Sequence, residues 1–199
     1  VFMAQQTAGN IDDVLEEILD YQVDGIVLAS VAMSSVLAER CDAAGIPVVL
    51  FNRAQQEDRF STVTSDNFAG GKALAEFLVA GGHRRIGYIA GWEGASTQRD
   101  REAGFCAGLA EHGHKLFARG VGDFRTETAA KAARAMFSAS EFPDAVFVAN
   151  DHMAFAVIEE LRGNLGLRVP EDVSVVGYDD VQLSRCCCLL YTSDAADDP

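Results

Sequence analysis

Basic residues are scarce in this sequence. Lys and Arg number 16 against 30 Asp and Glu, which gives a formal net charge of −14 over 199 residues. Nucleic-acid binding depends largely on Lys and Arg that displace counterions from phosphates, so we expect no DNA binding by this chain alone. The sequence also lacks an apolar run of the roughly 18 residues that a membrane helix needs, and residues 1–5 lack the basic and apolar regions of a signal peptide. We therefore expect a soluble protein.

Cysteines are few outside one adjacent run. Cys186, Cys187 and Cys188 are neighbours, and the only others are Cys41 and Cys106. Adjacent cysteines form no disulfide framework, and no histidine lies at zinc-ligand spacing around them. The residues that follow the run show neither a strand period nor a helix period, so residues 186–199 stand apart from the rest of the sequence.

Catalytic motifs are missing as well. The sequence has no GxSxG, GxxxxGK[ST] or HExxH pattern, and Gly120-Val121-Gly122 lacks the third glycine and the helix start of a dinucleotide fingerprint. The histidines show no close pair with a carboxylate in reach; they are His83, His112, His114 and His152. We expect a protein that is not an enzyme and that carries no metal and no cofactor.

What the sequence does contain is a repeated alternation of strand-like and helix-like segments. Short β-branched runs predict buried strands at residues 25–28, 47–51, 85–89, 145–148 and 173–176. Apolar side chains at helical spacing lie between them: Val14, Leu15, Ile18 and Leu19; Leu74, Phe77 and Leu78; Ala154, Val157, Ile158, Leu161 and Leu165. This order predicts an α/β fold in which parallel sheets are flanked by helices.

Polar start and glycine stop signals support these helices. Candidate N-caps are Asn10, then Asp66 or Asn67, then Asn150 or Asp151, and stops fall at Gly45, Gly81, Gly113 and Gly166. Residues 54–59 are polar and separate two strand-like runs with no helix between them. We place a domain boundary there.

Ligands of open α/β sheets bind outside the carboxyl ends of the strands, so the residues after each strand are candidates for a site. They are Ser30, Asn52, Arg53, Trp92, Glu93, Phe124, Asn150, Asp151, Asp179 and Asp180. Amides, carboxylates and aromatic rings suit a ligand with many hydroxyl groups. For Asn150 and Asp151 the alternative is a helix cap, and for Asp179 and Asp180 it is a turn. Arg99 and Arg101 near a helix start have either a polar ligand or only solvent as partner.

Several longer motifs resemble one family. They are residues 81–89 (GGHRRIGYI), 101–105 (REAGF), 143–151 (PDAVFVAND) and 168–180 (RVPEDVSVVGYDD), with 45–49 (GIPVV) and 63–67 (VTSDN) in the same order. They look like the effector-binding core of LacI/GalR-type bacterial transcription regulators, and the resemblance covers about residues 1–185.

That resemblance implies a two-lobe fold like the periplasmic sugar-binding proteins, with a small effector in the cleft. It makes residues 1–63 a fragment of the N-terminal lobe and residues 64–185 the C-terminal lobe. It also implies effector contacts at Arg101, Asn150 and Asp179, then Phe124 and Asn52, and more weakly Thr97. A sugar or sugar derivative is the expected effector, and a free sugar is preferred to a phosphate unless Arg53 or Arg99 adds charge.

The sequence departs from the family at both ends. The resemblance leads us to expect a helix-turn-helix and the lobe's first strand, neither of which is found in these 199 residues. We therefore expect DNA to be bound only through a missing N-terminal segment of a full-length homodimer in the cytoplasm. We expect residues 186–199 to be non-native and both lobes to be incomplete. The open alternatives are a periplasmic sugar-binding protein of a transport system and, as a third hypothesis, an enzyme that uses an acidic cleft.

Overall fold

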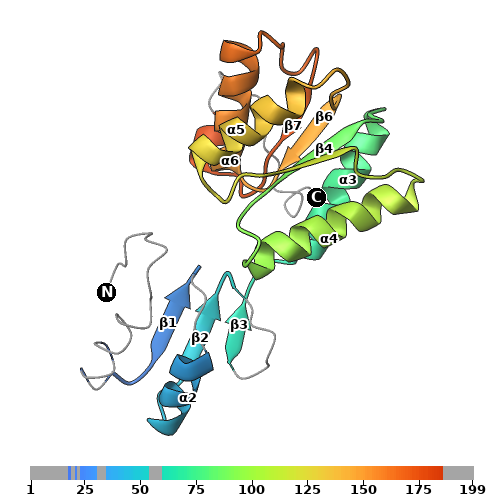
Figure 1. Ribbon diagram of the computed structural model, residues 1–199. Coiled ribbons are helices and arrows are strands. Elements are labelled where there is room, and N and C mark those ends of the chain that lie inside the picture. Colours follow the sequence, from blue (N-terminus) through green and yellow to red (C-terminus); the bar gives the residue numbers. More distant parts are fainter. Residues whose placement is uncertain (1–17, 19–20, 22, 31–34, 54–59, 186–199) are drawn as a thin grey trace. The chain divides into compact units, whose positions relative to one another are not determined.

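Parallel sheets with neighbouring helices form both units of the chain (Figure 1). The computed structural model describes residues 18, 21, 23–30, 35–53 and 60–185. The two units divide between Ser65 and Asp66, and each is described by itself. The predicted lobes, 1–63 and 64–185, and the non-native tail at 186–199 stay predictions; the tail lies outside the described residues.

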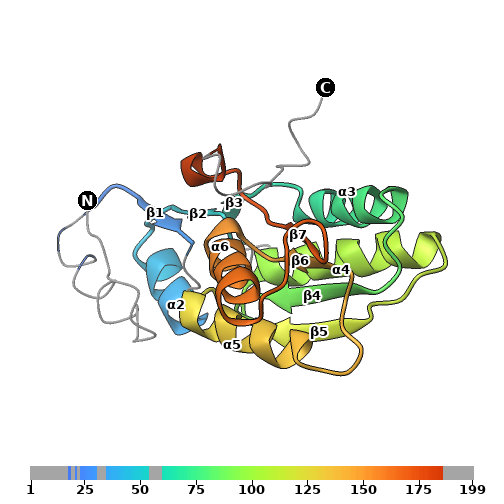
Figure 2. The ribbon, with the colours of Figure 1, turned by 90° about the horizontal axis from the view of Figure 1, so that it is seen from above.

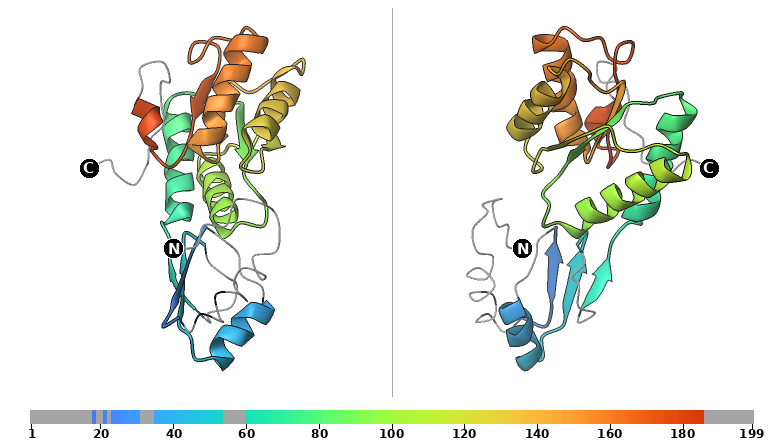
Figure 3. Two further views of the ribbon diagram at one scale, coloured as in Figure 1. Left: turned by 90° about the vertical axis from the view of Figure 1, so that its left-hand side faces the viewer. Right: turned by 45° about the vertical axis from the view of Figure 1, so that its right-hand side comes forward.

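The first unit has three parallel strands in the order β1-β2-β3. They span Ile26–Ala29, Val48–Phe51 and Ser61–Val63, and Ile26 is paired with Val48. Helix α2, Ser35–Ala43, connects β1 to β2 and lies on one side of the strands (Figure 3). Alternate strand residues point to opposite faces, so the core side collects the buried side chains of Ile26, Leu28, Ala38, Cys41, Val48 and Leu50.

The second unit has four parallel strands in the order β5-β4-β6-β7. Their bounds are β4 Ile86–Ala90, β5 Ala118–Val121, β6 Ala145–Val148 and β7 Ser174–Val176. Every residue of β4 and β6 is buried, as expected for central strands covered on both faces. This sheet carries the larger of the two hydrophobic cores.

Helices cover both faces of this second sheet (Figure 2). Helices α3, Asn67–Ala80, and α4, Ser96–Glu111, pack together on one face, while α5, Thr126–Phe137, and α6, Asp151–Glu159, lie on the other. Helix α6 continues as a π-helix at Glu160–Asn164, and a 3-10 turn follows at Gln182–Arg185. The predicted α/β class with parallel sheets flanked by helices is therefore confirmed.

The five strands predicted with bounds are observed with shifts of one residue at most. Two further strands, which the sequence implied without giving bounds, are β3 after residues 54–59 and β5 before Phe124. The structure also decides between the alternative caps. Asp66 rather than Asn67 caps α3, because its side chain accepts the Ala69 N–H, and Asn150 rather than Asp151 caps α6 by accepting the Met153 N–H. The predicted helix with Asn10 as cap lies outside the described residues except for Ile18, which packs against the first core.

One predicted core residue is wrong. Phe77 is 59% exposed, whereas Leu74 and Leu78 are buried. The buried stripe of α3 is instead Asn67, Gly70, Gly71, Leu74, Ala75 and Leu78. Gly70 and Gly71 belong to this buried stripe but have no apolar side chain. A prediction from apolar side chains alone therefore assigns Phe77 to the buried face by mistake.

Candidate functional site

The guanidinium of Arg101 is held by three elements of the second unit. Its Nε donates to Asn67 Oδ1 at 2.8 Å, Nη1 donates to the Ala149 carbonyl at 2.6 Å, and Nη2 donates to Asp179 Oδ1 at 3.0 Å. The residue is only 5% exposed. A guanidinium carries five N–H groups, so these bonds leave one N–H on each Nη nitrogen for a further acceptor.

This guanidinium lies where the strand order reverses. The chain runs from β4 outward to β5 and then returns past β4 to β6, so the switch point falls between β4 and β6. Ala149, which accepts from Arg101, directly follows β6. In open α/β sheets ligands bind at the carboxyl edge of such a switch point. Topology and hydrogen bonding therefore indicate the same edge.

Two glycines bring α3 and α4 close enough for Asn67 to reach Arg101. A Cβ added at Gly71 would meet the Arg101 carbonyl, and one added at Gly104 would meet the Phe68 carbonyl, each closer than real atoms approach. Asn67 is the first residue of α3 and is 2% exposed. Because Gly71 and Gly104 have no side chains, the two helices can approach closely enough to place the Arg101 side chain beside Asn67.

The Tyr178 ring forms a further wall. The guanidinium carbon of Arg101 lies 3.7 Å from the ring centroid, at cation–π distance. Tyr178 directly precedes Asp179, so one short segment supplies both an aromatic face and a carboxylate to the same arginine. A Cβ at Gly70 would meet the Tyr178 hydroxyl, so α3 also packs on this ring.

Asp151 is buried close to Asp179, the carboxylate that pairs with Arg101. Its Oδ2 accepts the Val181 N–H at 2.9 Å, its own N–H donates to the Tyr178 carbonyl at 2.9 Å, and its Oδ1 has no hydrogen-bond partner within the described chain. Burial, together with the charges of Asp179 and Asp180, raises the pKa of this carboxyl to about 6, and the backbone hydrogen bonds oppose that rise. The fold therefore disfavours the charged form of this carboxyl.

Asn150 and Phe124 lie at the ends of β6 and β5. The Oδ1 of Asn150 accepts from the Met153 N–H at 3.1 Å, so the cap interpretation is correct for that atom, and the side-chain amide nitrogen makes none of the hydrogen bonds recorded for the described residues. The Phe124 ring packs at the end of β4, where a Cβ on Gly91 would overlap it. Both residues are half-buried.

The non-glycine residues with left-handed backbone conformation lie just after strands. Every non-glycine residue with positive φ among the described ones follows a strand within a few positions: Ser30, Asn52, Asp123, Phe124, Asp179 and Asp180. Such conformations cost energy in L-residues and cluster at functional sites. Four of the six predicted contacts concern these strand ends: Asn52, Phe124 and Asp179 are left-handed there, and Asn150 follows β6.

The remaining predicted residues occupy different places. Thr97 lies in the first turn of α4 and is 2% exposed. Asn52 belongs to the first unit, where its Nδ2 donates to Ser30 Oγ at 3.1 Å. The structure brings Arg101 and Asp179 into direct contact, while the ligand-binding role of all six residues stays a prediction.

Sequence reasoning misses three residues that build the site. It identifies Asn67 only as a candidate cap and Tyr178 only as part of a motif, and it does not single out Gln98. Gln98 is 1% exposed, and its Oε1 accepts from the Gly91 N–H at 2.6 Å and the Tyr88 hydroxyl at 2.9 Å. Its Nε2 donates to Glu102, which also accepts from Arg119. One feature of the sequence could have indicated the role of Asn67: Gly70 and Gly71, which follow it in α3, allow another part of the chain to approach closely.

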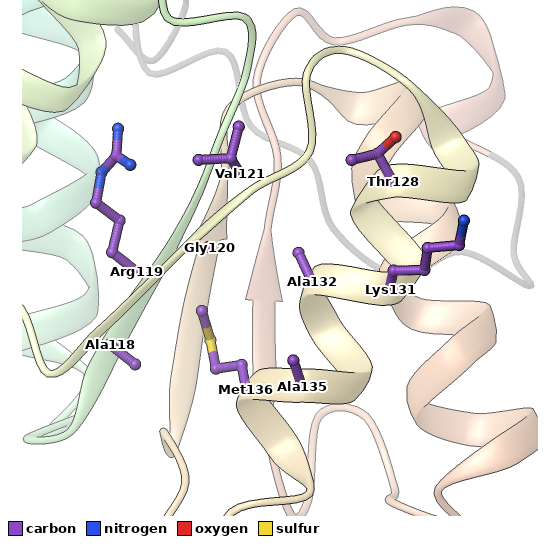
Figure 4. A pocket seen from close by; sticks show the side chains of 9 residues that line it. All are labelled: Ala118, Arg119, Gly120, Val121, Thr128, Lys131, Ala132, Ala135 and Met136. Atoms are coloured by element: carbon purple, nitrogen blue, oxygen red, sulfur yellow. The ribbon is translucent and has the colours of Figure 1, made fainter.

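A hollow of about 470 Å³ lies elsewhere, between edge strand β5 and helix α5 (Figure 4). Small and aliphatic side chains line most of it, and the Arg119 side chain points away from α5. Among the described residues, no group of three or more His, Cys, Asp or Glu side chains could hold a metal ion. None of the described helices is both long and apolar enough to span a bilayer.

Comparison with known proteins gives a consistent result. A family model described as a periplasmic binding protein domain matches residues 1–185. The HTH-type transcriptional regulator CelR of Thermobifida fusca is 39% identical over 165 residues, which are 79% of this chain and 47% of CelR. The chain spans about half the length of the curated relatives it matches.

Solved structures agree with the sequence relatives. A complex of the regulator CelR with cellobiose has a TM-score of 0.79 at 33% identity, covering 87% of this chain and 54% of that one. A dimeric lac repressor with an 11-residue C-terminal deletion has a TM-score of 0.81 at 27% identity, covering 92% of this chain and 69% of that one. The chain therefore belongs to the periplasmic binding protein domain family and is an effector-binding domain of the LacI type of transcriptional regulator.

Proposed function

We propose that this domain senses a neutral sugar for a transcriptional repressor. The observation that carries the proposal is the buried Arg101 guanidinium at the sheet's switch point, which has an N–H to spare on each Nη nitrogen. Two N–H groups on one planar guanidinium suit a pair of neighbouring hydroxyl oxygens. Asn150, Asp179 and Phe124 supply an amide, a carboxylate and an aromatic face along the same sheet edge.

The charge balance favours a neutral ligand over a phosphorylated one. Asp179 Oδ1 lies 3.0 Å from Arg101 Nη2, so this buried cation already has a counter-ion. Asp151 and Asp180 add further negative charge close by, since Asp179 and Asp180 both act on the Asp151 carboxyl. A phosphate would have to approach these carboxylates while Arg101 is already paired with Asp179, whereas hydroxyl groups can both donate to carboxylates and accept from Arg101.

The relatives support the regulatory part of the proposal. CelR is an HTH-type transcriptional regulator and has been solved with cellobiose. We propose that the whole protein likewise carries a helix-turn-helix segment, acts as a homodimer in the cytoplasm, and is no enzyme. Contacts at Asn52 in the first unit and at Thr97 complete the proposed ligand set. The regulator relatives favour this function over the periplasmic transport alternative.

The test is a thermal-shift screen of the intact protein with neutral sugars, including cellobiose, and with their phosphates. Calorimetric titration of a hit should then show binding that falls about ten- to a hundredfold in Arg101→Ala, because a charge-assisted set of hydrogen bonds is lost. Arg101→Lys keeps the charge without the fork and should also weaken binding. Arg99→Ala is the matched control, since Arg99 is an exposed arginine on the same helix. Unchanged affinity in both Arg101 variants would contradict the assignment, and tighter binding of a phosphate would contradict the neutral ligand.

A further inference from the structure

Asp151 holds the segment after β7 at two points. Its backbone N–H donates to the Tyr178 carbonyl, and its Oδ2 accepts from the Val181 N–H, each at 2.9 Å. These two bonds bracket Asp179 and Asp180, which are the only residues between them. One residue at the first position of α6 thus fixes both ends of a two-residue segment.

The bracketed residues need such support. Asp179 has φ 105° and Asp180 has φ 44°, and both values are unfavourable for L-residues. Without contacts that compensate for it, a strained segment relaxes to ordinary backbone. The Ser184 hydroxyl donates to Asp180 Oδ1 at 3.0 Å, but this bond comes from the same stretch of chain and does not tie it to the sheet. Asp151 ties the segment to the start of α6.

The bracket also determines what Arg101 meets. Asp179 accepts from Nη2 of Arg101, and Ala149, two residues before Asp151, accepts from Nη1. Both acceptors of the guanidinium's outer nitrogens are therefore placed by the start of α6 or by the segment that Asp151 holds. Asp151 itself is 0% exposed, so it lies behind these groups and not among those that face solvent.

We propose that Asp151 is a positioning residue that holds Asp179 in place to pair with Arg101, without touching the ligand itself. This inference rests on the proposed function for its effect on sugar binding, but its structural core concerns the segment alone. The charged groups that act on Asp151 are Asp179 and Asp180 from that segment, and both disfavour its negative charge. The N-terminus of α6 opposes them, because helix N-termini favour negative charge.

The experiment follows the Val181 amide in the intact, isotope-labelled protein by NMR. In Asp151→Ala we expect its hydrogen exchange to speed up at least tenfold, because the acceptor is gone. In Asp151→Asn the exchange should stay near that of the parent protein, because the amide oxygen still accepts. Glu127→Gln is the matched control: Glu127 is an exposed acid in the first turn of α5. Unchanged exchange in Asp151→Ala overturns the proposal.

A second measurement keeps the test decisive if Asp151→Ala fails to fold. The Val181 amide nitrogen shift of the parent protein should titrate near pH 6 as Asp151 takes up its proton, and Asp151→Asn should abolish that inflection. A Val181 nitrogen shift that is the same in the parent protein and in Asp151→Asn at every pH overturns the proposal, because the side chain of residue 151 would then have no contact with this amide. This arm uses no ligand, so its result is independent of whether the protein binds a sugar.

Cellobiose is the probe for the link to binding. Its affinity should fall about tenfold in Asp151→Ala and recover in Asp151→Asn. Val157→Ala, a core variant further along α6, serves as a control for lost stability and should keep the affinity. Equal loss in Val157→Ala and Asp151→Ala at matched stability would overturn the positioning role. Failure of cellobiose to bind the parent protein counts against this sugar as effector and leaves the amide measurements to decide the positioning role.

Discussion

The guanidinium carbon of Arg101 lies 3.7 Å from the centre of the Tyr178 ring, while the next residue in the chain, Asp179, accepts from the same guanidinium. Two consecutive residues, Tyr178 and Asp179, thus hold the Arg101 guanidinium with an aromatic face and a carboxylate. The ring limits where the guanidinium can swing, and the carboxylate sets its direction. If Arg101 binds the effector as proposed, this arrangement places the arginine in advance and reduces the entropy that binding must overcome.

The aromatic part of this pair is tested by Tyr178→Leu. We expect it to lower the free energy of unfolding by about 2 to 3 kcal/mol and to weaken binding of the proposed sugar effector, because the cation–π contact and the contact with Phe147 are both lost. Tyr178→Phe keeps the ring and should bind the sugar within about threefold of the parent protein, a change of about 0.7 kcal/mol. Urea denaturation and calorimetry measure the two effects. Equal affinities in the Leu and Phe variants would show that the ring has no part in placing Arg101.

Gln98 is expected to be essential for the turn after β4. Its Oε1 is the acceptor for both the Gly91 N–H and the Tyr88 hydroxyl in a buried place. Gln98→Ala leaves both donors without this acceptor, so we expect a loss of about 2 to 4 kcal/mol in unfolding free energy. Trp92 is the single tryptophan and lies in this turn, so its fluorescence reports the change directly. Asp100→Ala, an exposed position of the same helix, is the control; similar losses in both would argue against the network.

The close approach of α3 and α4 is tested at Gly104. Gly104→Ala would place a Cβ against the Phe68 carbonyl, and neither backbone can yield without moving a helix. We expect a loss of about 2 to 4 kcal/mol in the free energy of unfolding, together with weaker binding of the proposed sugar effector as Arg101 shifts. Gly163→Ala meets nothing within 4 Å and should be neutral or stabilise by about 0.5 to 1 kcal/mol. Thermal denaturation of both variants decides; a Gly104→Ala variant as stable as the parent protein would mean that the helices have room to separate.

The buried carboxyl of Asp151 should make stability depend on pH. Its pKa is raised from 3.8 to about 6 in the folded chain, so the folded state binds the proton more tightly than the unfolded one. Its stabilising contribution is therefore complete below about pH 3.8 and is lost as the pH rises through about 6. Relative to the parent protein, Asp151→Asn should gain about 1 to 3 kcal/mol between pH 4 and pH 7.5. Urea denaturation at several pH values measures this gain, and a constant difference between the two proteins would contradict it.

How far the sequence predicts this molecule differs between fold and site. The strands at 86–90 and 145–148 follow from runs of apolar residues, since a buried parallel strand needs apolar side chains on both faces. The contact between Arg101 and Asp179 joins residues 78 positions apart, and that between Arg101 and Asn67 joins residues 34 apart. No local period encodes such pairs; they depend on how two helices and a strand end meet.

Glycine explains the main error and one of the omissions. The buried stripe of α3 includes Gly70 and Gly71, which have no side chain for a hydrophobicity count to register. Such a count therefore assigns Phe77 to the core and does not link Asn67 to Arg101. The alternative roles of Asn150 are a different matter. Its two polar atoms allow it to cap α6 with Oδ1 while the amide nitrogen serves another purpose, so a cap does not exclude a site.

The left-handed residues at the strand ends have a consequence for protein engineering. Replacing such residues with glycine commonly removes strain, so a selection for heat resistance would favour glycine at Asp179, Asp180 or Phe124. The same substitutions would delete the carboxylate opposite Arg101 or the ring at Gly91. We therefore expect variants that gain heat resistance at these positions to lose affinity for the proposed effector.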